Sequence, residues 1–352
     1  MFLGIDPTLA RAFATIEDGW GGRDAASGPL ELRAAIDAAL IDDFQSVPRS
    51  PGVVKSTFRV LTDDGHLLDV HRYARSSISE GADIDAAVLY AHGGGMIAGS
   101  TALYDPVLRF YALATGVPFF SVDYRLAPEA TGDRPARDFL DAYGWMIRNA
   151  IQLGIDSSRI GFMGDSGGGG VAASAAILAR DRGFRPTSTI LICPMLDARN
   201  TTPDPGLEPA ASWTSADNAV AWRARIGEED LTPLVSPADN IDFGGLAPTY
   251  IEVGSLDIFR DECLRYAHSL VQGGVDVEFH LLPGAPHGYD WFAFESDYTE
   301  RWLPGRIRAI QSIRQSPAVP DVLVSTTEST LTSDQRTMTR SVDDSIEFEL
   351  RR

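Results

Sequence analysis

The segment GDSGG at positions 164–168 places a serine between glycines, directly after a short apolar stretch. A Gly-x-Ser-x-Gly pattern between a strand and a helix is typical of a nucleophile elbow, a tight turn that holds the serine hydroxyl out above the sheet. A glycine-rich phosphate loop and an ordinary turn are the alternatives for so short a pattern. The run of small residues that follows predicts a helix where the elbow needs one, so we interpret Ser166 as a nucleophile.

A second glycine cluster, HGGG at positions 92–95, follows another apolar stretch. Glycines in such a loop let backbone N–H groups point at a developing oxyanion, where side chains would be in the way. A turn that needs positive φ explains one glycine better than three. Beside a nucleophile elbow, this cluster predicts an oxyanion loop.

A serine nucleophile needs a general base, and the sequence offers six histidines: His66, His71, His92, His268, His280 and His287. Four of them fall in a predicted turn, in two strands and in the middle of a helix, and His92 belongs to the glycine cluster. A histidine in a loop is usually just solvated. His287, however, follows a predicted strand, and catalytic residues favour loops at the carboxyl ends of strands. We therefore predict that His287 is the base.

The acid that orients the base is expected after a strand between Ser166 and His287. Asp257 follows the predicted strand 249–253, and the resulting order of serine, aspartate and histidine is one that serine hydrolases use. Asp261 and Glu262 open the next helix, where acidic side chains interact favourably with the helix dipole. We predict that Asp257 accepts a hydrogen bond from the base and fixes its tautomer, while the other ring nitrogen takes the serine proton.

The elements that must position these residues alternate along the chain. Segments 56–61 and 67–73, with Asp-Gly between them, predict a β-hairpin. Short apolar segments bounded by Gly, Pro or Asp predict strands buried on both faces, at 86–91, 118–123, 159–163, 188–193, 249–253 and 277–282. Helices are predicted between them, at 104–115, 135–152, 169–182, 259–273 and 298–313. This alternation predicts one α/β domain, with a mostly parallel central sheet and helices on both faces.

Three parts of the chain fall outside the alternation. Residues 1–50 have an amphipathic helical pattern, and residues 199–230 are expected to add helices over one end of the sheet. The stretch 316–352 is rich in Ser and Thr and is expected to be a flexible tail, although 345–350 alternates like a strand. The predicted catalytic domain is therefore 51–315.

Composition excludes several classes of function. The chain has 352 residues with 49 acidic and 30 basic side chains, a net charge of −19, which disfavours nucleic acid and membrane surfaces as partners. Lys55 is the only lysine and lies outside any glycine-rich segment, which argues against Schiff-base and P-loop chemistry. Two cysteines, Cys193 and Cys263, support neither a disulfide framework nor a CxxC zinc site, so no metal or cofactor is expected. Because neither a signal-peptide core nor a run of about 18 apolar residues is seen, a cytoplasmic protein is expected.

Taken together, these motifs resemble the hormone-sensitive-lipase-like (bacterial family IV) esterases of the α/β-hydrolase fold. The resemblance covers about residues 55–312, and its pieces are HGGG at 92–95, DYRLAPE at 123–129, GDSGG at 164–168, SP at 236–237, DIFRDE at 257–262 and HGY at 287–289. It implies that Ser166, Asp257 and His287 are the nucleophile, acid and base. It also implies a helical cap made by 1–50 and 199–230.

The resemblance further implies that the N–H groups of Gly94, Gly95 and Gly167 form the oxyanion hole. Two positions depart from the family pattern. Met96 stands where an aromatic residue often follows the glycine triplet, and Gly167 replaces a commoner alanine.

These observations predict a serine carboxylic ester hydrolase that acts through an acyl-enzyme. The expected partners are soluble short- to medium-chain or aromatic esters or lactones, held by Met96, Trp213, Trp222 and Tyr289. A homodimer is also possible, because the alternating tail segment could pair with another subunit. A non-catalytic small-molecule receptor and a lyase or cyclase are the alternatives. The presence of His287 argues against the first, and that of Ser166 against the second.

Overall fold

An eight-stranded sheet forms the centre of the computed structural model, which describes residues 4–20, 28–76 and 85–316. Its strand order is β1-β2-β4-β3-β5-β6-β7-β8. The strands are β1 (Val53–Leu61), β2 (Leu67–Arg75), β3 (Asp85–Ala91), β4 (Phe119–Val122), β5 (Ile155–Asp165), β6 (Thr189–Ile192), β7 (Thr249–Gly254) and β8 (Val277–Leu282). β2 pairs antiparallel with β1 and β4, and all the other pairs are parallel. The predicted hairpin and mostly parallel sheet are confirmed.

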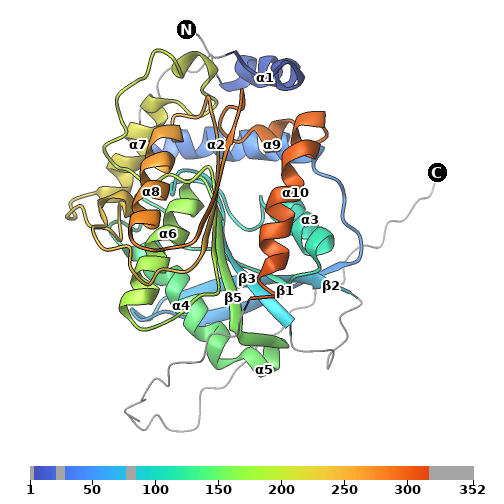
Figure 1. Ribbon diagram of the computed structural model, residues 1–352, viewed down its shortest axis with the longest axis vertical. Helices are drawn as coiled ribbons and strands as arrows, with labels where there is room; N and C mark the ends of the chain where they lie inside the picture. The colour runs from blue at the N-terminus through green and yellow to red at the C-terminus, as the bar shows by residue number, and fades with distance from the viewer. Residues whose placement is uncertain (1–3, 21–27, 77–84, 317–352) are drawn as a thin grey trace.

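Helices cover both faces of the sheet (Figure 1). α4 and α6 pack together on one face with α8 beside them, and α3 and α10 pack on the other. Their bounds are α3 (Asp105–Thr115), α4 (Arg134–Arg148), α5 (Ala150–Leu153), α6 (Gly167–Asp181), α8 (Arg260–Gln272) and α10 (Asp297–Ser312). The helix predicted over 135–152 is divided, because the chain leaves the helical conformation at Asn149, where φ is −112°. With helices on both faces of a mostly parallel sheet, this is the α/β-hydrolase arrangement that the sequence predicts.

The remaining helices gather at one end of the sheet, at the top of Figure 1. They are α1 (Pro7–Trp20), α2 (Pro29–Asp43), α7 (Ser215–Ile226) and α9 (Tyr289–Phe292). Residues 199–230 are less helical than expected: besides α7 they contain only the short 3-10 helix Glu208–Ala210. Prolines at 203, 205 and 209 explain this, because proline ends or prevents helices. Apart from Ser316, the expected tail lies outside the described residues.

α2 is fastened to the loop that carries the HGGG segment. Its inner face buries Leu32, Ile36 and Leu40. Arg33 donates to the carbonyl of Ala127 at 2.7 Å and also pairs with a nearby glutamate. Further along the helix, an aspartate at position 37 accepts a hydrogen bond from the N–H of Gly99 at 2.8 Å. The C-terminal half of α2 is thereby held over the end of the sheet where β5 leads into Ser166.

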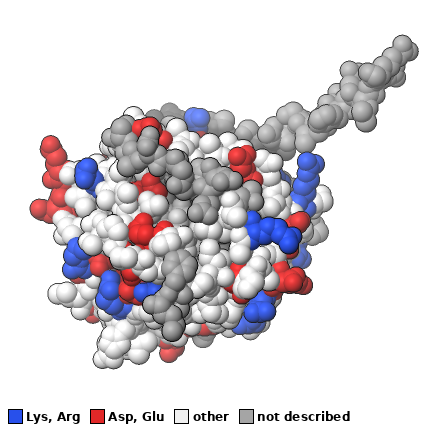
Figure 2. Space-filling view, turned by 90° about the horizontal axis from the view of Figure 1, so that it is seen from above, with Lys and Arg blue, Asp and Glu red and all other residues white. Residues whose placement is uncertain are grey.

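The surface charge is mixed on the face seen in Figure 2, which looks down on this end of the molecule. Outside the grey atoms, acidic and basic side chains are interspersed there. Within the described ranges, every helix is too short or too polar to cross a membrane.

Candidate active site

Ser166 lies in a strained turn between β5 and α6. Its backbone angles are φ 54° and ψ −120°, a conformation that costs energy for any residue with a side chain. The turn brings strand and helix so close that a Cβ on Gly164 would lie 2.2 Å from the carbonyl oxygen of Gly168. A Cβ on Gly168 would lie equally close to the carbonyl oxygen of Ala91, in β3. The flanking glycines are therefore needed for close packing, as in a nucleophile elbow.

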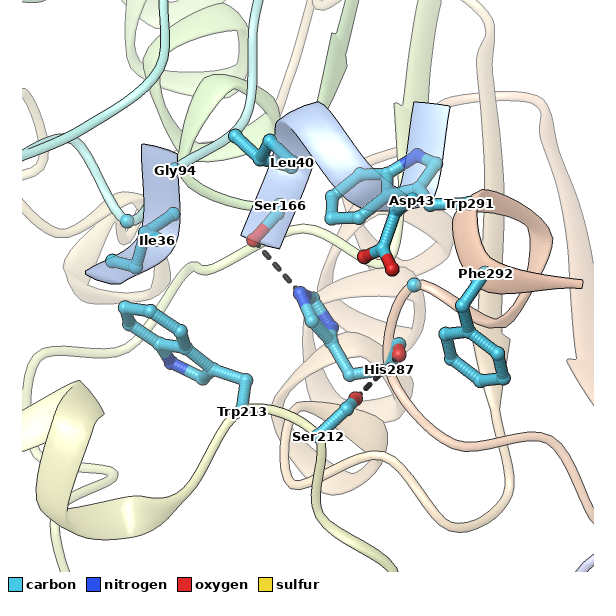
Figure 3. Close-up of a pocket in the computed structure, with 12 residues that line it drawn as sticks. Ile36, Leu40, Asp43, Gly94, Ser166, Ser212, Trp213, His287, Trp291 and Phe292 are labelled. Carbon is cyan, nitrogen blue, oxygen red and sulfur yellow. Dashed lines mark hydrogen bonds between the residues drawn. The ribbon is translucent and has the colours of Figure 1, made fainter. Parts of the chain in front are cut away.

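Ser166, His287 and Asp257 form one chain of hydrogen bonds. Ser166 Oγ lies 2.9 Å from His287 Nε2 (Figure 3), and His287 Nδ1 lies 2.7 Å from Asp257 Oδ2. All three side chains are buried. Because a carboxylate can only accept, Nδ1 carries the proton in this arrangement, and Nε2 is left to accept from the serine hydroxyl.

Of the three acidic residues considered in the sequence, Asp257 is the one that reaches His287. Its second oxygen accepts a hydrogen bond from the N–H of Phe259 at 2.9 Å, which fixes the orientation of the carboxylate. Asp261 instead pairs with the neighbouring Arg260 at the surface.

Glu262 differs from the helix-terminal charge that the sequence suggests. It is fully buried, and it accepts hydrogen bonds from the N–H of Leu196 at 2.6 Å and from the side chain of Asn200 at 2.7 Å. Burial raises the pKa of Glu262 to about 8. The residue therefore ties α8 to the loop that follows β6, away from the catalytic chain.

His287 is held by contacts that the sequence does not reveal. The hydroxyl of Ser212 donates to the His287 carbonyl at 2.6 Å, from the segment 199–230. The imidazole meets the rings of Phe259 and Trp291 edge to face, with centroids 5.1 and 5.9 Å away. These neighbours limit the rotation of the ring that must face both Ser166 and Asp257.

The three glycines predicted for the oxyanion hole lie beside Ser166. Gly94 and Gly95 have φ of 116° and 60°, values that favour glycine. A Cβ on Gly167 would come within 2.5 Å of the Met96 nitrogen, so the two loops are in direct contact. Within the described residues, the N–H groups of Gly94, Gly95 and Gly167 donate to no other group. They are free to bind an anionic oxygen.

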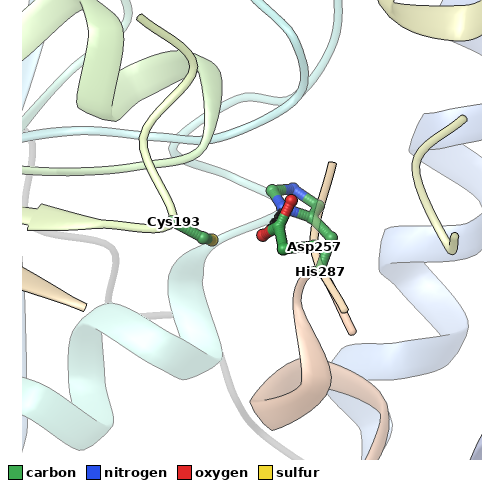
Figure 4. A group of neighbouring side chains, drawn as sticks. All are labelled: Cys193, Asp257 and His287. Carbon is green, nitrogen blue, oxygen red and sulfur yellow. Dashed lines mark hydrogen bonds and ion pairs between the residues drawn. The ribbon is translucent and has the colours of Figure 1, made fainter. Parts of the chain in front are cut away.

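Cys193 lies beside the hydrogen-bonded pair formed by Asp257 and His287 (Figure 4). Its sulfur, one carboxylate oxygen and one ring nitrogen all lie within 4.8 Å of one another, a grouping that could hold a metal ion. Burial raises the pKa of the Cys193 thiol well above its usual range, which keeps it protonated. Since Asp257 and His287 also use their facing atoms for each other, this donor set suits a hydrogen-bonded pair with a neutral thiol beside it better than a metal site.

A cavity opens in front of Ser166 and His287, and it encloses about 420 Å³ when the space open to solvent at its mouth is counted. Its walls come from α2, the HGGG loop, the segment before α7, and α9 (Figure 3). The lining residues are Ile36, Leu40, Asp43, Gly94, Gly95, Ser166, Ser212, Trp213, His287, Gly288, Trp291 and Phe292.

Of the four residues predicted to hold substrate, one lines this cavity. Trp213 does, with the edge of its ring against Gly95. Met96 and Trp222 are almost completely buried in the core, and Tyr289 packs in a separate apolar cluster with α1 and α10. Neighbouring segments cover the side chains of Met96, Trp222 and Tyr289. A sequence pattern does not reveal which segments lie over a side chain. Asp43, Trp291 and Phe292 also line the cavity, although no sequence pattern indicated them; the aromatic pair closely follows the HGY motif.

The chain is similar to known proteins of the α/β-hydrolase fold. A family model described as the alpha/beta hydrolase fold matches residues 88–290. Ethyl acetate hydrolase of Pseudomonas putida is 32% identical over 303 residues, which cover 82% of this chain and 92% of that protein. Hormone-sensitive lipase of Mus musculus is 37% identical over 106 residues, covering 30% of this chain and 14% of that protein. Among solved structures, a bacterial heroin esterase aligns with a TM-score of 0.79 at 32% identity, covering 90% of this chain and 99% of that one.

The family match spans more than half of the chain, and the Pseudomonas relative is similar over nearly its whole length. The chain therefore belongs to the α/β-hydrolase-fold family, as a hormone-sensitive-lipase-like ester hydrolase.

Proposed function

We propose that this protein is a serine carboxylic ester hydrolase that works through an acyl-enzyme, with Ser166 as nucleophile, His287 as base and Asp257 as acid. One observation carries the proposal. An unbroken chain of hydrogen bonds links the three side chains at 2.9 and 2.7 Å, beside backbone N–H groups that have no other partner among the residues the structure describes.

The proposed reaction has two halves. Ser166 Oγ attacks the ester carbonyl carbon while His287 Nε2 takes its proton, and the N–H groups of Gly94, Gly95 and Gly167 stabilise the oxyanion. Nε2 then gives the proton to the leaving alcohol as the ester C–O bond breaks, leaving Ser166 acylated. Water, deprotonated by the same nitrogen, attacks the acyl-enzyme, and the acid and free serine are released. A lactone would react in the same way, except that its alcohol would stay attached to the acyl group.

Small, soluble esters or lactones fit this site best. The cavity opens beside Ser166 and His287 and has walls of aromatic and aliphatic side chains, the kind of lining that small-molecule sites have. The similarity to a protein named ethyl acetate hydrolase supports a short acyl chain. We further propose that 1–50 and 199–230 act as a cap on the catalytic part 51–315, because α2, Ser212 and Trp213 close the cavity from above.

Hydrolysis of p-nitrophenyl esters from acetyl to palmitoyl tests the proposal, together with labelling by a serine-directed organophosphate. The wild-type protein should turn over acetyl or butyryl esters fastest and take up one label, located at Ser166 by peptide mass spectrometry. Ser166→Ala should fold normally but lose label and turnover, with kcat falling by about 10⁴ or more. More than a few per cent of activity in pure Ser166→Ala would refute the assignment. Binding of esters without any turnover would instead indicate a receptor, and fastest turnover of palmitoyl esters would refute the preference for short chains.

A further inference from the structure

The active-site cavity carries one carboxylate that the proposed reaction does not use. Asp43 is the last residue of α2, and Figure 3 shows its carboxylate pointing from the helix into the space beside His287. Among the described residues, nothing forms a hydrogen bond or ion pair with this carboxylate. The lining residues include no lysine or arginine that could neutralise it.

Unlike Asp43, two other buried carboxylates each have a positively charged partner. Glu252 and Asp290 both pair with the buried guanidinium of Arg306, which compensates for the loss of water around them. Asp43 is half-buried and has no such partner in the described chain. A carboxylate in that position is costly unless something else supplies the positive charge.

Local electrostatics add to this imbalance. Burial, with a smaller contribution from the neighbouring Asp42, raises the pKa of Asp43 to about 7. The last turn of α2 contains no basic residue, and a helix C-terminus itself carries partial negative charge. This part of the cavity is therefore suited to a cation.

The walls around Asp43 are of the kind that bind a desolvated cation. Trp213, Trp291 and Phe292 line the same cavity, and Figure 3 shows Trp291 and Phe292 on the side of His287 where the carboxylate lies, with Trp213 on the opposite side. Aromatic rings attract ammonium groups through their quadrupole, and most strongly where water is excluded. A carboxylate together with several aromatic rings forms a receptor for a substituted ammonium group.

We propose that Asp43, with Trp213, Trp291 and Phe292, makes this site selective for esters that carry an ammonium group. The inference rests on the proposed ester hydrolysis and adds a substrate class to it. Asp43 takes no part in bond breaking. It binds the charged end of the substrate and thereby positions the ester carbonyl at Ser166.

Two pairs of isosteric esters test the proposal. Acetylcholine and 3,3-dimethylbutyl acetate differ by a nitrogen cation in place of a carbon on the alcohol side. Betaine ethyl ester and ethyl 3,3-dimethylbutanoate differ in the same way on the acyl side. The measured quantity is the ratio of kcat/KM for the charged ester to that for the neutral ester, at pH 8.5, where Asp43 is ionised. Comparing this ratio between variants cancels the intrinsic reactivity of each ester.

Asp43→Asn should lower the ratio by about tenfold or more for at least one pair, since a charge contact in a partly desolvated site is lost. Asp42→Asn is the matched control, because it removes the same charge from an exposed side chain of the same helix turn that does not line the cavity. The ratio should stay unchanged in this variant. Asp43→Glu keeps the charge and should keep most of the preference.

Each other outcome contradicts the inference. An unchanged ratio in Asp43→Asn for both pairs would overturn it while leaving the proposed hydrolase intact, provided p-nitrophenyl acetate is still hydrolysed through Ser166. An equal fall in Asp42→Asn would show that the overall negative charge, rather than the cavity, attracts cations. Failure of the wild-type protein to hydrolyse any ester, p-nitrophenyl acetate included, would overturn the proposed function and the inference with it.

Discussion

Replacing Asp257 by asparagine should reverse the direction of the hydrogen bond to His287 while keeping the shape of the side chain. One oxygen of Asp257 accepts from the N–H of Phe259 at 2.9 Å, so the asparagine should keep its carbonyl oxygen there. Its NH₂ group would then face His287 Nδ1, where the second carboxylate oxygen now lies at 2.7 Å. The imidazole would have to accept at Nδ1 and carry its proton on Nε2. Ser166 would face an N–H group that cannot take its proton.

The size of the effect follows from that change of tautomer. The equivalent substitution lowers kcat by about 10⁴ in serine proteases, which corresponds to about 5.5 kcal/mol of transition-state stabilisation. We expect a similar loss here in steady-state hydrolysis of p-nitrophenyl butyrate, with a KM close to that of the wild-type protein. Because the asparagine retains the shape of the aspartate, near-ultraviolet circular dichroism should not change.

Asp261→Asn is the matched control for this experiment. Asp261 is four residues further along, and it pairs with Arg260 at the surface, so its loss should change kcat less than threefold, with an effect on stability of about 0.3–1 kcal/mol. If Asp261→Asn were the more damaging variant, or if Asp257→Asn retained a tenth of the activity, the assignment of the acid would be refuted.

Two further predictions concern the HGGG loop and Asp43. Gly95→Ala should lower kcat by about 10²–10³ in the same ester assay, because its Cβ would lie 2.6 Å from the Trp213 ring and displace an oxyanion N–H. The control is Gly65→Ala, which is also at positive φ but has open space around its Cβ; it should lower stability yet leave kcat unchanged. Equal loss of activity in both variants would refute the role of the loop. Asp43→Asn should raise the melting temperature by a few degrees at pH 8 but hardly at pH 4. The Asp43 carboxyl, whose pKa rises to about 7 on folding, binds more protons in the folded than in the unfolded state. Its ionisation between about pH 4 and 7 therefore destabilises the native state, and asparagine removes that effect. A melting-temperature difference independent of pH would contradict this reasoning.

Local sequence was sufficient for the framework of the fold. Asp-Gly between alternating segments predicted the β1–β2 hairpin, and short apolar runs predicted the six strands that follow it. Both signals depend on neighbouring residues alone: on a turn that needs positive φ at Gly65, and on burial of consecutive side chains in a sheet covered on both faces. The turn at Ser166 could also be predicted from local sequence, because the glycines that permit the turn are next to Ser166 in the chain.

The walls of the cavity could not be predicted in the same way. Trp213 and Trp222 look alike in the sequence and are both buried in the core, yet only Trp213 lines the cavity. Asp43 ends a helix more than a hundred residues before Ser166, and no local pattern distinguishes it from the exposed Asp42 beside it. Whether such side chains face a site depends on how distant segments pack against one another.

By itself, the sequence determined the kinds of groups proposed for catalysis, their order along the chain and the sheet that carries them, because these features depend on residue type and on near neighbours. The tertiary structure decided which acid reaches His287, since Asp257 and Glu262 are both buried near the same strand but only one carboxylate is directed at the ring. The tertiary structure also decided which segments surround the space in which a substrate ester would bind. Ser166 and His287 are separated by 121 residues, and α2 crosses above them from the other end of the chain. The meeting of such segments is set by close packing across the whole fold, which no short stretch of sequence contains.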